Sequence, residues 1–137
     1  MMKEIASLIV LLAFCIPALA VDMPDMVGNW TGTFNDVSWL KNTDFRASGR
    51  PDYLDNAYTI SIEEQNGTRF VGRITLNRNP LTSEVLLGVI ASNNEITLVD
   101  EDGYLWGFMK SPTEMELFYQ AVDIDYMKMG GGTFTKE

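Results

Sequence analysis

Apolar and polar residues alternate along most of this chain, and a period of two is the pattern of β-strands. The alternation begins at residues 27–34, where Gly28, Trp30, Gly32 and Phe34 fall on one face of an extended strand. Glycines on the inner face of a tightly curved sheet relieve crowding beside a large ring. We therefore interpret this segment as the first strand of a small β-barrel, with Trp30 closing one end.

The same alternation predicts seven further strands, at residues 57–64, 69–76, 84–91, 95–101, 104–110, 113–122 and 131–136. Asn66-Gly67 and Asp102-Gly103 favour tight two-residue hairpins between them. The pattern places Arg69 and Arg73 on the outer face. The side chains predicted to point inward are Tyr58, Ile60, Ile62, Phe70, Gly72, Ile74, Leu76, Tyr104, Trp106, Phe108, Met115, Leu117 and Tyr119.

Eight strands in sequence, joined mostly by short turns, indicate an antiparallel meander. Such a meander closes into a barrel and thereby removes its edges. The predicted fold is thus all-β, an eight-stranded antiparallel up-and-down β-barrel. An open two-sheet sandwich is the alternative that the strand pattern leaves open.

The loop lengths divide the predicted barrel into a closed and an open end. Every second connection is tight, whereas residues 35–56, 77–83 and 123–130 form longer loops at the opposite end. Long ordered loops are commonly functional, so we expect a ligand at this open end. The predicted ligand-binding residues are Phe34, Trp39, Tyr58, Tyr104, Trp106 and Tyr119. In this prediction Tyr58 and Tyr119 orient a ligand by hydrogen bonds, Trp106 stacks on it, and Trp39, Phe45 and Tyr53 cover it.

The first twenty residues differ from the rest of the chain. Lys3 precedes an apolar run over residues 5–16, and Ala18-Leu19-Ala20 follows it. This is the pattern of a cleaved secretory signal peptide, and the run is shorter than the ~20 residues of a membrane anchor. We expect a signal peptide at 1–20, a barrel domain at 21–137 and no membrane span after cleavage. The protein is then secreted, periplasmic or on the cell surface, and an intact mass that begins at Val21 would test this.

Composition restricts the chemistry. The net charge is −9, which argues against nucleic acid as a partner. The chain has no histidine, and its one cysteine, Cys15, lies in the predicted signal. Serine–histidine and cysteine–histidine catalysis are therefore excluded, and so are the usual zinc sites. We predict no catalytic residue, no metal and no cofactor. A calcium site at Asp100-Glu101-Asp102 is a less favoured alternative to solvated turn residues.

Several short motifs resemble the calycins, the superfamily of lipocalins, fatty-acid-binding proteins and avidins. Gly28-x-Trp30 resembles their opening motif, and residues 131–136 and 104–108 are similar to the last and sixth strands of avidins. Gly72 and Gly88 fall in strands where avidins also have glycine. The resemblance implies a ligand-binding barrel. It does not imply biotin, because Thr31 to Asn35 depart from the avidin residues that bind biotin.

Two functions remain open at this point. The first is an exported carrier or sensor that binds a small apolar or aromatic molecule without catalysis. The second is a protein–protein interaction module, such as an inhibitor or cell-surface protein, that acts through its long loops. A cavity at the open end favours the first function, and a solid core with exposed aromatic side chains favours the second.

Overall fold

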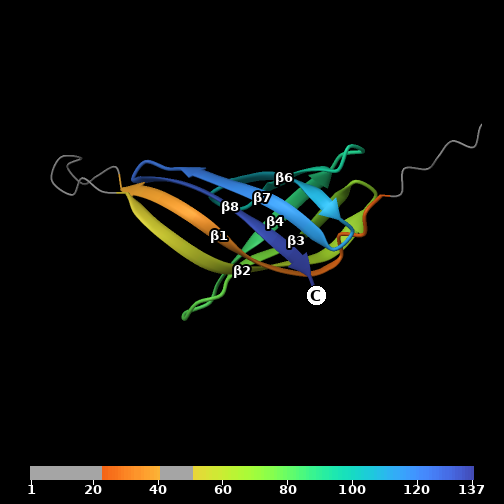
Figure 1. Ribbon diagram of the computed structural model, residues 1–137, viewed down its shortest axis with the longest axis horizontal. Helices are drawn as coiled ribbons and strands as arrows, with labels where there is room; N and C mark the ends of the chain where they lie inside the picture. Colours follow the sequence, from red (N-terminus) through yellow and green to blue (C-terminus); the bar gives the residue numbers. More distant parts are fainter. Residues whose placement is uncertain (1–22, 41–50) are drawn as a thin grey trace, which may run out of the picture.

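The computed structural model describes residues 23–40 and 51–137, and these form a closed antiparallel barrel. Each strand pairs with its neighbours in sequence, and β1 pairs with β8 to complete the wall (Figure 1). The predicted all-β fold and up-and-down order are confirmed. Residues 1–20, the predicted signal, lie outside the described residues. The strands are β1 (Gly28–Leu40), β2 (Asp52–Asn66), β3 (Arg69–Leu76), β4 (Thr82–Ile90), β5 (Glu95–Val99), β6 (Tyr104–Ser111), β7 (Glu114–Val122) and β8 (Tyr126–Lys136).

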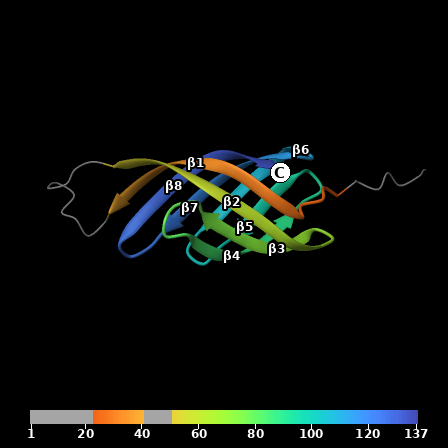
Figure 2. The same cartoon turned by 90° about the horizontal axis from the view of Figure 1, so that it is seen from below.

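The two ends of the barrel differ, as the loop lengths predict. In Figure 1 the hairpins β2–β3, β4–β5 and β6–β7 lie toward the right with the C-terminus, and the β3–β4 and β7–β8 connections lie toward the left. Figure 2 shows the same closed wall after a quarter turn. Within the described ranges no helix is long and apolar enough to span a membrane.

The interior of the barrel is a packed apolar core over most of its length. Ile60, Leu86, Leu105 and Leu117 are almost completely buried, and they come from strands all around the wall. Gly88 shows why small residues are needed on the inner face, because a Cβ there would overlap the ring of Phe70. The glycine lets the neighbouring aromatic ring lie across the interior.

The predicted closure of one end by Trp30 is confirmed. Trp30 is fully buried, and its indole Nε1 donates a hydrogen bond of 2.9 Å to the carbonyl oxygen of Met26. Lys136, its register partner on β8, places its ammonium 5.5 Å from the centre of the indole. The same ammonium donates a hydrogen bond of 2.8 Å to the carbonyl oxygen of Asp25. Trp30 and Lys136 thus both pair the first strand with the last and close this end of the barrel.

Three strands are longer than the sequence pattern predicts, so the open-end loops are shorter. β1 and β2 remain paired up to Ser38 and Asp52, within the predicted loop 35–56. β8 begins at Tyr126 instead of residue 131. Trp39 pairs with Met127 across β1 and β8, and Tyr53 is 79% exposed. Neither residue lines the cavity at this end, and Phe45 lies outside the described residues.

The predicted inner face of β6 is wrong. Leu105, Gly107 and Met109 point inward, whereas Tyr104 and Phe108 are about two-fifths exposed on the outer face at 39% and 41%. The alternation of large rings at even positions suggested the opposite assignment. These rings are instead held outside, where Trp106 stacks on Phe118 of β7 with 5.6 Å between ring centres.

Candidate functional site

A cavity of about 200 Å³ opens at the end of the barrel that carries the β3–β4 and β7–β8 connections. The rest of the interior is the packed apolar core. The barrel therefore has both a cavity at its open end and a packed core, which the sequence analysis treats as alternatives. The cavity is lined by Phe34, Tyr58, Ile74, Leu76, Arg78, Thr82, Glu84, Asp100, Asp102, Tyr119, Tyr126 and Lys128. Its wall is therefore apolar and aromatic on one part and charged on another.

Three of the six residues predicted to bind a ligand come together at this cavity. The ring of Phe34 is 5.4 Å from the ring of Tyr58 in an edge-to-face arrangement, and 6.1 Å from that of Tyr119. Such geometries are the favourable ones between aromatic rings. These three rings come from β1, β2 and β7, and each lies on the inward-facing side of its strand. They form the inner, aromatic part of the cavity.

The other three predicted residues lie elsewhere. Tyr104 and Trp106 stack with 6.0 Å between their ring centres on the outside of β6. Trp39 lines a separate apolar groove beside Met127 and Met129. The structure therefore gives Trp106 no position from which it could stack on a molecule in the cavity.

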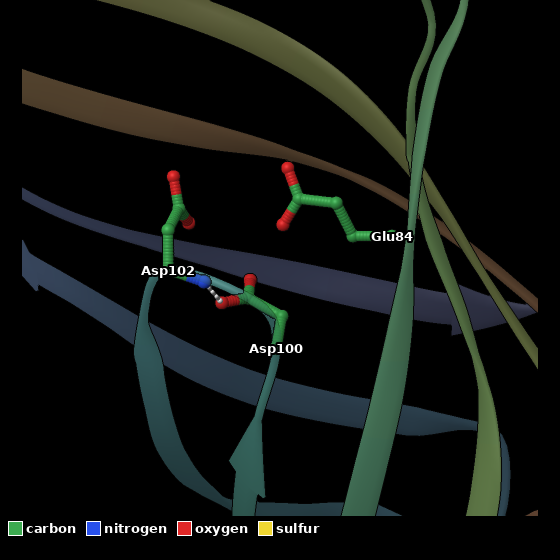
Figure 3. Close-up of side chains that lie close together, drawn as sticks. All are labelled: Glu84, Asp100 and Asp102. Carbon is green, nitrogen blue, oxygen red and sulfur yellow. Dashed lines mark hydrogen bonds between the residues drawn. The ribbon is translucent and has the colours of Figure 1, made fainter.

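Three carboxylates of the cavity wall converge on one another (Figure 3). Glu84 projects from β4 toward Asp100 and Asp102 of the β5–β6 turn, and oxygens of all three lie within 4.8 Å of one another. Oδ1 of Asp100 accepts backbone N–H groups of Asp102 and Gly103, at 3.3 Å and 2.6 Å. The backbone of the turn therefore fixes the Asp100 carboxylate beside the cavity.

The Asp102 carboxylate is held by two tyrosines. Tyr119 donates its hydroxyl proton to one oxygen at 2.9 Å, and Tyr126 donates to the other at 2.8 Å. Burial, together with the nearby acidic groups, raises the pKa of Tyr119 above its ordinary value and that of Tyr126 to about 12. Both hydroxyls therefore stay protonated at neutral pH and act as donors.

The negative charges of Glu84 and Asp100 are less well stabilised than that of Asp102. Burial, with repulsion from Asp102 and Asp100, raises the pKa of Glu84. Burial is also the main cause that raises the pKa of Asp100. The backbone N–H of Glu101 favours the charged form of Glu84, but it does not outweigh burial and repulsion. This cluster is where a cation would be held, and Glu84, not Glu101, completes it.

A buried ion pair forms the third part of the site. Nζ of Lys128 lies 2.9 Å from Oδ2 of Asp36, whose side chain is fully buried. The same ammonium donates to the hydroxyl of Tyr58 at 3.3 Å and lies 5.3 Å from the ring centre of Tyr119. Asn56 also donates to Oδ2 of Asp36, at 3.0 Å. The pair holds the tyrosine rings of the cavity in place.

The second Asp36 oxygen, Oδ1, is buried and has no hydrogen-bond partner among the described residues. It occupies the space in which a side chain at position 130 would begin, so Gly130 is required opposite Asp36. Burial by itself would lower the pKa of Lys128. The hydrogen bonds and charges of Asp36 and Tyr58 outweigh this effect, so the pKa of Lys128 is raised. Lys128 therefore stays charged at neutral pH and is not a nucleophile.

Sequence reasoning missed Glu84, Asp36, Lys128 and Tyr126 as site residues. The alternation contains the signal, because Glu84 precedes Leu86, Gly88 and Ile90 on one face. Asp36 follows Trp30 and Phe34 in the same way, provided that β1 is extended past residue 34. Asp36, Tyr126 and Lys128 fall in the predicted loops and Glu84 at the start of a predicted strand, although all four line or support the wall of the cavity.

Comparisons with known proteins support the fold alone. No family model matches the chain, and no curated protein matches it. Among solved structures, it is similar to a protein of unknown function from the DUF3598 family of Nostoc punctiforme. The TM-score is 0.53 at 8% sequence identity, and the match covers 82% of this chain. The chain spans about half of that structure, 47% of its length.

The Glu84→Gln variant should be more stable than the natural chain at pH 7. The raised pKa of Glu84 means that its charged form is disfavoured in the folded state. A neutral amide at this position removes that cost to the free energy of folding. The gain should shrink as the pH falls toward and below the ordinary value of 4.5, because Glu84 is then protonated. Thermal melts between pH 4 and pH 8 would measure it. Glu95→Gln, on the exposed side of β5, should change little, and an equal gain there would contradict the explanation.

Proposed function

We propose that this protein is an exported calycin-type barrel that binds a small aromatic or apolar molecule at its open end, without turnover. The observation that carries the proposal is the cavity in which Phe34, Tyr58 and Tyr119 converge above a solid core. Ligand pockets typically combine apolar rings with a few placed polar groups. No residue of the cavity pairs a nucleophile with an activating base, which supports binding instead of catalysis.

The size of the cavity limits the ligand. Its volume of about 200 Å³ is below the ~300–1,000 Å³ of pockets for drug-sized molecules. A single ring with a short substituent fits this space, whereas a long acyl chain would have to extend out of the open end. We therefore favour a compact ligand that places its ring against the aromatic part of the cavity.

The charges of the wall favour a cationic substituent on that ring. Lys128 is already paired with Asp36, and both Asp102 oxygens accept tyrosine protons. Glu84 and the second oxygen of Asp100 are the acceptors that remain, and their ionised forms are disfavoured by burial. A primary amine would donate to them and offset that cost. An anionic ligand would meet repulsion at the same place.

This function can be tested with benzylamine, benzyl alcohol and benzoate as matched probes in calorimetric titrations. We expect benzylamine to bind most tightly and benzoate most weakly. Glu84→Gln should weaken benzylamine about tenfold, since a charge-assisted hydrogen bond contributes roughly 1.5–3 kcal/mol. It should leave benzyl alcohol binding unchanged, because that probe carries no charge.

Two further variants show whether binding takes place in the cavity. Leu76→Trp places a larger side chain in the cavity wall and should abolish binding of all three probes. Trp106→Ala removes a ring of similar size from the outer face and should leave binding intact. The proposal is wrong if none of the probes binds, or if Leu76→Trp binds them as the natural chain does.

A further inference from the structure

Arg78 lines the cavity, but the proposed function gives it no role. Of the two cations in the cavity wall, Lys128 is already paired with the buried Asp36. Arg78 is exposed at the open end and forms no ion pair with any residue that the structure describes. Its guanidinium group is therefore the positive charge of the cavity wall that is available to a ligand.

A tight turn at the end of β3 brings Arg78 to the mouth of the cavity. Its backbone N–H donates a hydrogen bond of 2.9 Å to the carbonyl oxygen of Leu76, the last residue of β3. Glu84 lies deeper in the barrel, because the strand register places it opposite the buried Ile74, two residues before the end of β3. The basic group therefore lies at the rim, and the acidic group lies below it on the neighbouring strand.

The acidic and basic parts of the cavity wall remain separate. The carboxylates of Glu84, Asp100 and Asp102 converge on one another (Figure 3). Within the described ranges, none of them forms an ion pair with Arg78. Opposite charges that line one cavity without meeting are suited to a ligand that carries both charges itself. Each charge of the wall then gains a partner when the ligand binds.

We propose that the ligand of this cavity is an aromatic α-amino acid in its zwitterionic form. Its ammonium group donates to Glu84 and Asp100, its carboxylate accepts from Arg78, and its ring lies against the aromatic part of the cavity. The planar guanidinium group of arginine matches a carboxylate with two parallel hydrogen bonds. This inference rests on the proposed function, because it specifies a second substituent beside the cationic one.

The arrangement of the wall favours an α-amino acid over other molecules with two opposite charges. β3 and β4 are hydrogen-bonded neighbours, so Arg78 and Glu84 lie on the same side of the mouth. An α-amino acid carries its ammonium and carboxylate groups on one carbon. Both groups can therefore face this side while the ring faces Phe34 and Tyr119 on β1 and β7. A peptide would have to extend out of the open end, because the cavity volume is only about 200 Å³.

Calorimetric titrations at pH 7 with phenylalanine, phenethylamine and 3-phenylpropionate test the proposal. The three probes share a ring and a two-carbon chain and differ in the charged groups that they carry. We expect the preferred enantiomer of phenylalanine to bind about fivefold more tightly than phenethylamine, the gain from a well-oriented charge pair near the surface. The weakest probe should be 3-phenylpropionate, which lacks the ammonium group. The two enantiomers of phenylalanine should differ in affinity, because the ring and both charged groups are each held at a separate place.

Two variants of Arg78 show whether this residue binds the carboxylate. Arg78→Gln should weaken phenylalanine about fivefold and should not weaken phenethylamine, because only phenylalanine carries the carboxylate. Arg78→Glu should make phenethylamine the tighter of the two probes. Arg73→Gln is the matched control, because Arg73 pairs with Glu63 on the outer face of β3 and does not line the cavity. It removes the same charge and should leave the affinity for both probes unchanged.

The outcomes separate this inference from the proposed function. If phenethylamine binds at least as tightly as phenylalanine, the ligand is not an amino acid, although the proposed function stands. The inference is also wrong if Arg78→Gln weakens both probes equally, or if Arg73→Gln weakens phenylalanine as much. If neither probe binds, the inference is overturned, and benzylamine then shows whether the proposed function fails with it. Melting curves would confirm that each variant is folded.

Discussion

Trp30→Ala should lower the free energy of unfolding by roughly 3–5 kcal/mol, the range for deleting a large buried ring. Trp30 is fully buried at the closed end of the barrel. The change also leaves the carbonyl of Met26 without its donor, although Met26 itself is buried. In addition, the Lys136 ammonium loses the ring face over which it lies.

Chemical denaturation of the natural and variant proteins would measure this loss. Trp30→Phe should cost less than Trp30→Ala, because it keeps a ring but removes the hydrogen bond to Met26. Tyr53→Ala, on a side chain that is 79% exposed, should stay within about 0.5 kcal/mol of the natural chain. A loss below about 1 kcal/mol for Trp30→Ala would mean that the indole is not part of the core.

The closed end could be predicted from sequence because several independent signals agree there. Gly28, Trp30 and Phe34 share one face, and a barrel that closes must bring the first strand against the last. Asn66-Gly67 is a strong local turn signal that sets the β2–β3 connection. Local propensity and closure thus specify the same arrangement, and the pairing of Trp30 with Lys136 follows.

The face of β6 could not be predicted because both of its faces are apolar. Leu105 and Met109 on one face compete with Tyr104, Trp106 and Phe108 on the other, and ring size suggested the wrong face. Register within a barrel is set by the strand pairs on both sides, which alternation within one strand does not contain. Here the register places Gly107 opposite Leu117, where the backbone of β7 leaves no room for a Cβ.

The polar part of the cavity was missed for a different reason. Asp36 and Lys128 lie in segments rich in polar residues, which are typical of loops, and yet both point into the barrel. Their pairing joins residues 92 positions apart (128 − 36), so no local pattern reveals it. Buried charges are tolerated when they are paired and hydrogen-bonded. A series of inward residues that ends in a charged one is therefore a useful indication of a cavity wall.

Lys128→Met should lower the free energy of unfolding by about 3 kcal/mol at pH 7, because breaking a buried pair leaves one charge uncompensated. The Asp36 side chain is fully buried, whereas that of Lys128 is 18% exposed, so the aspartate is the partner that cannot reach water. Asp36→Asn should accordingly cost less, and the double variant should recover much of the loss from Lys128→Met. Denaturation of all four proteins completes a double-mutant cycle, which isolates the pair energy.

The pH dependence separates this ion pair from a loss of packing. Because the pKa of Lys128 is raised above 10.5, its stabilisation is complete below that pH and is lost as the pH rises through the folded value. The natural chain should therefore lose more stability above pH 10.5 than Lys128→Met does. Tyr126, with its pKa raised to about 12, weakens both proteins over the same range, so their difference isolates Lys128. Parallel alkaline curves for the two proteins would show that Lys128 contributes through its methylene groups and not its charge.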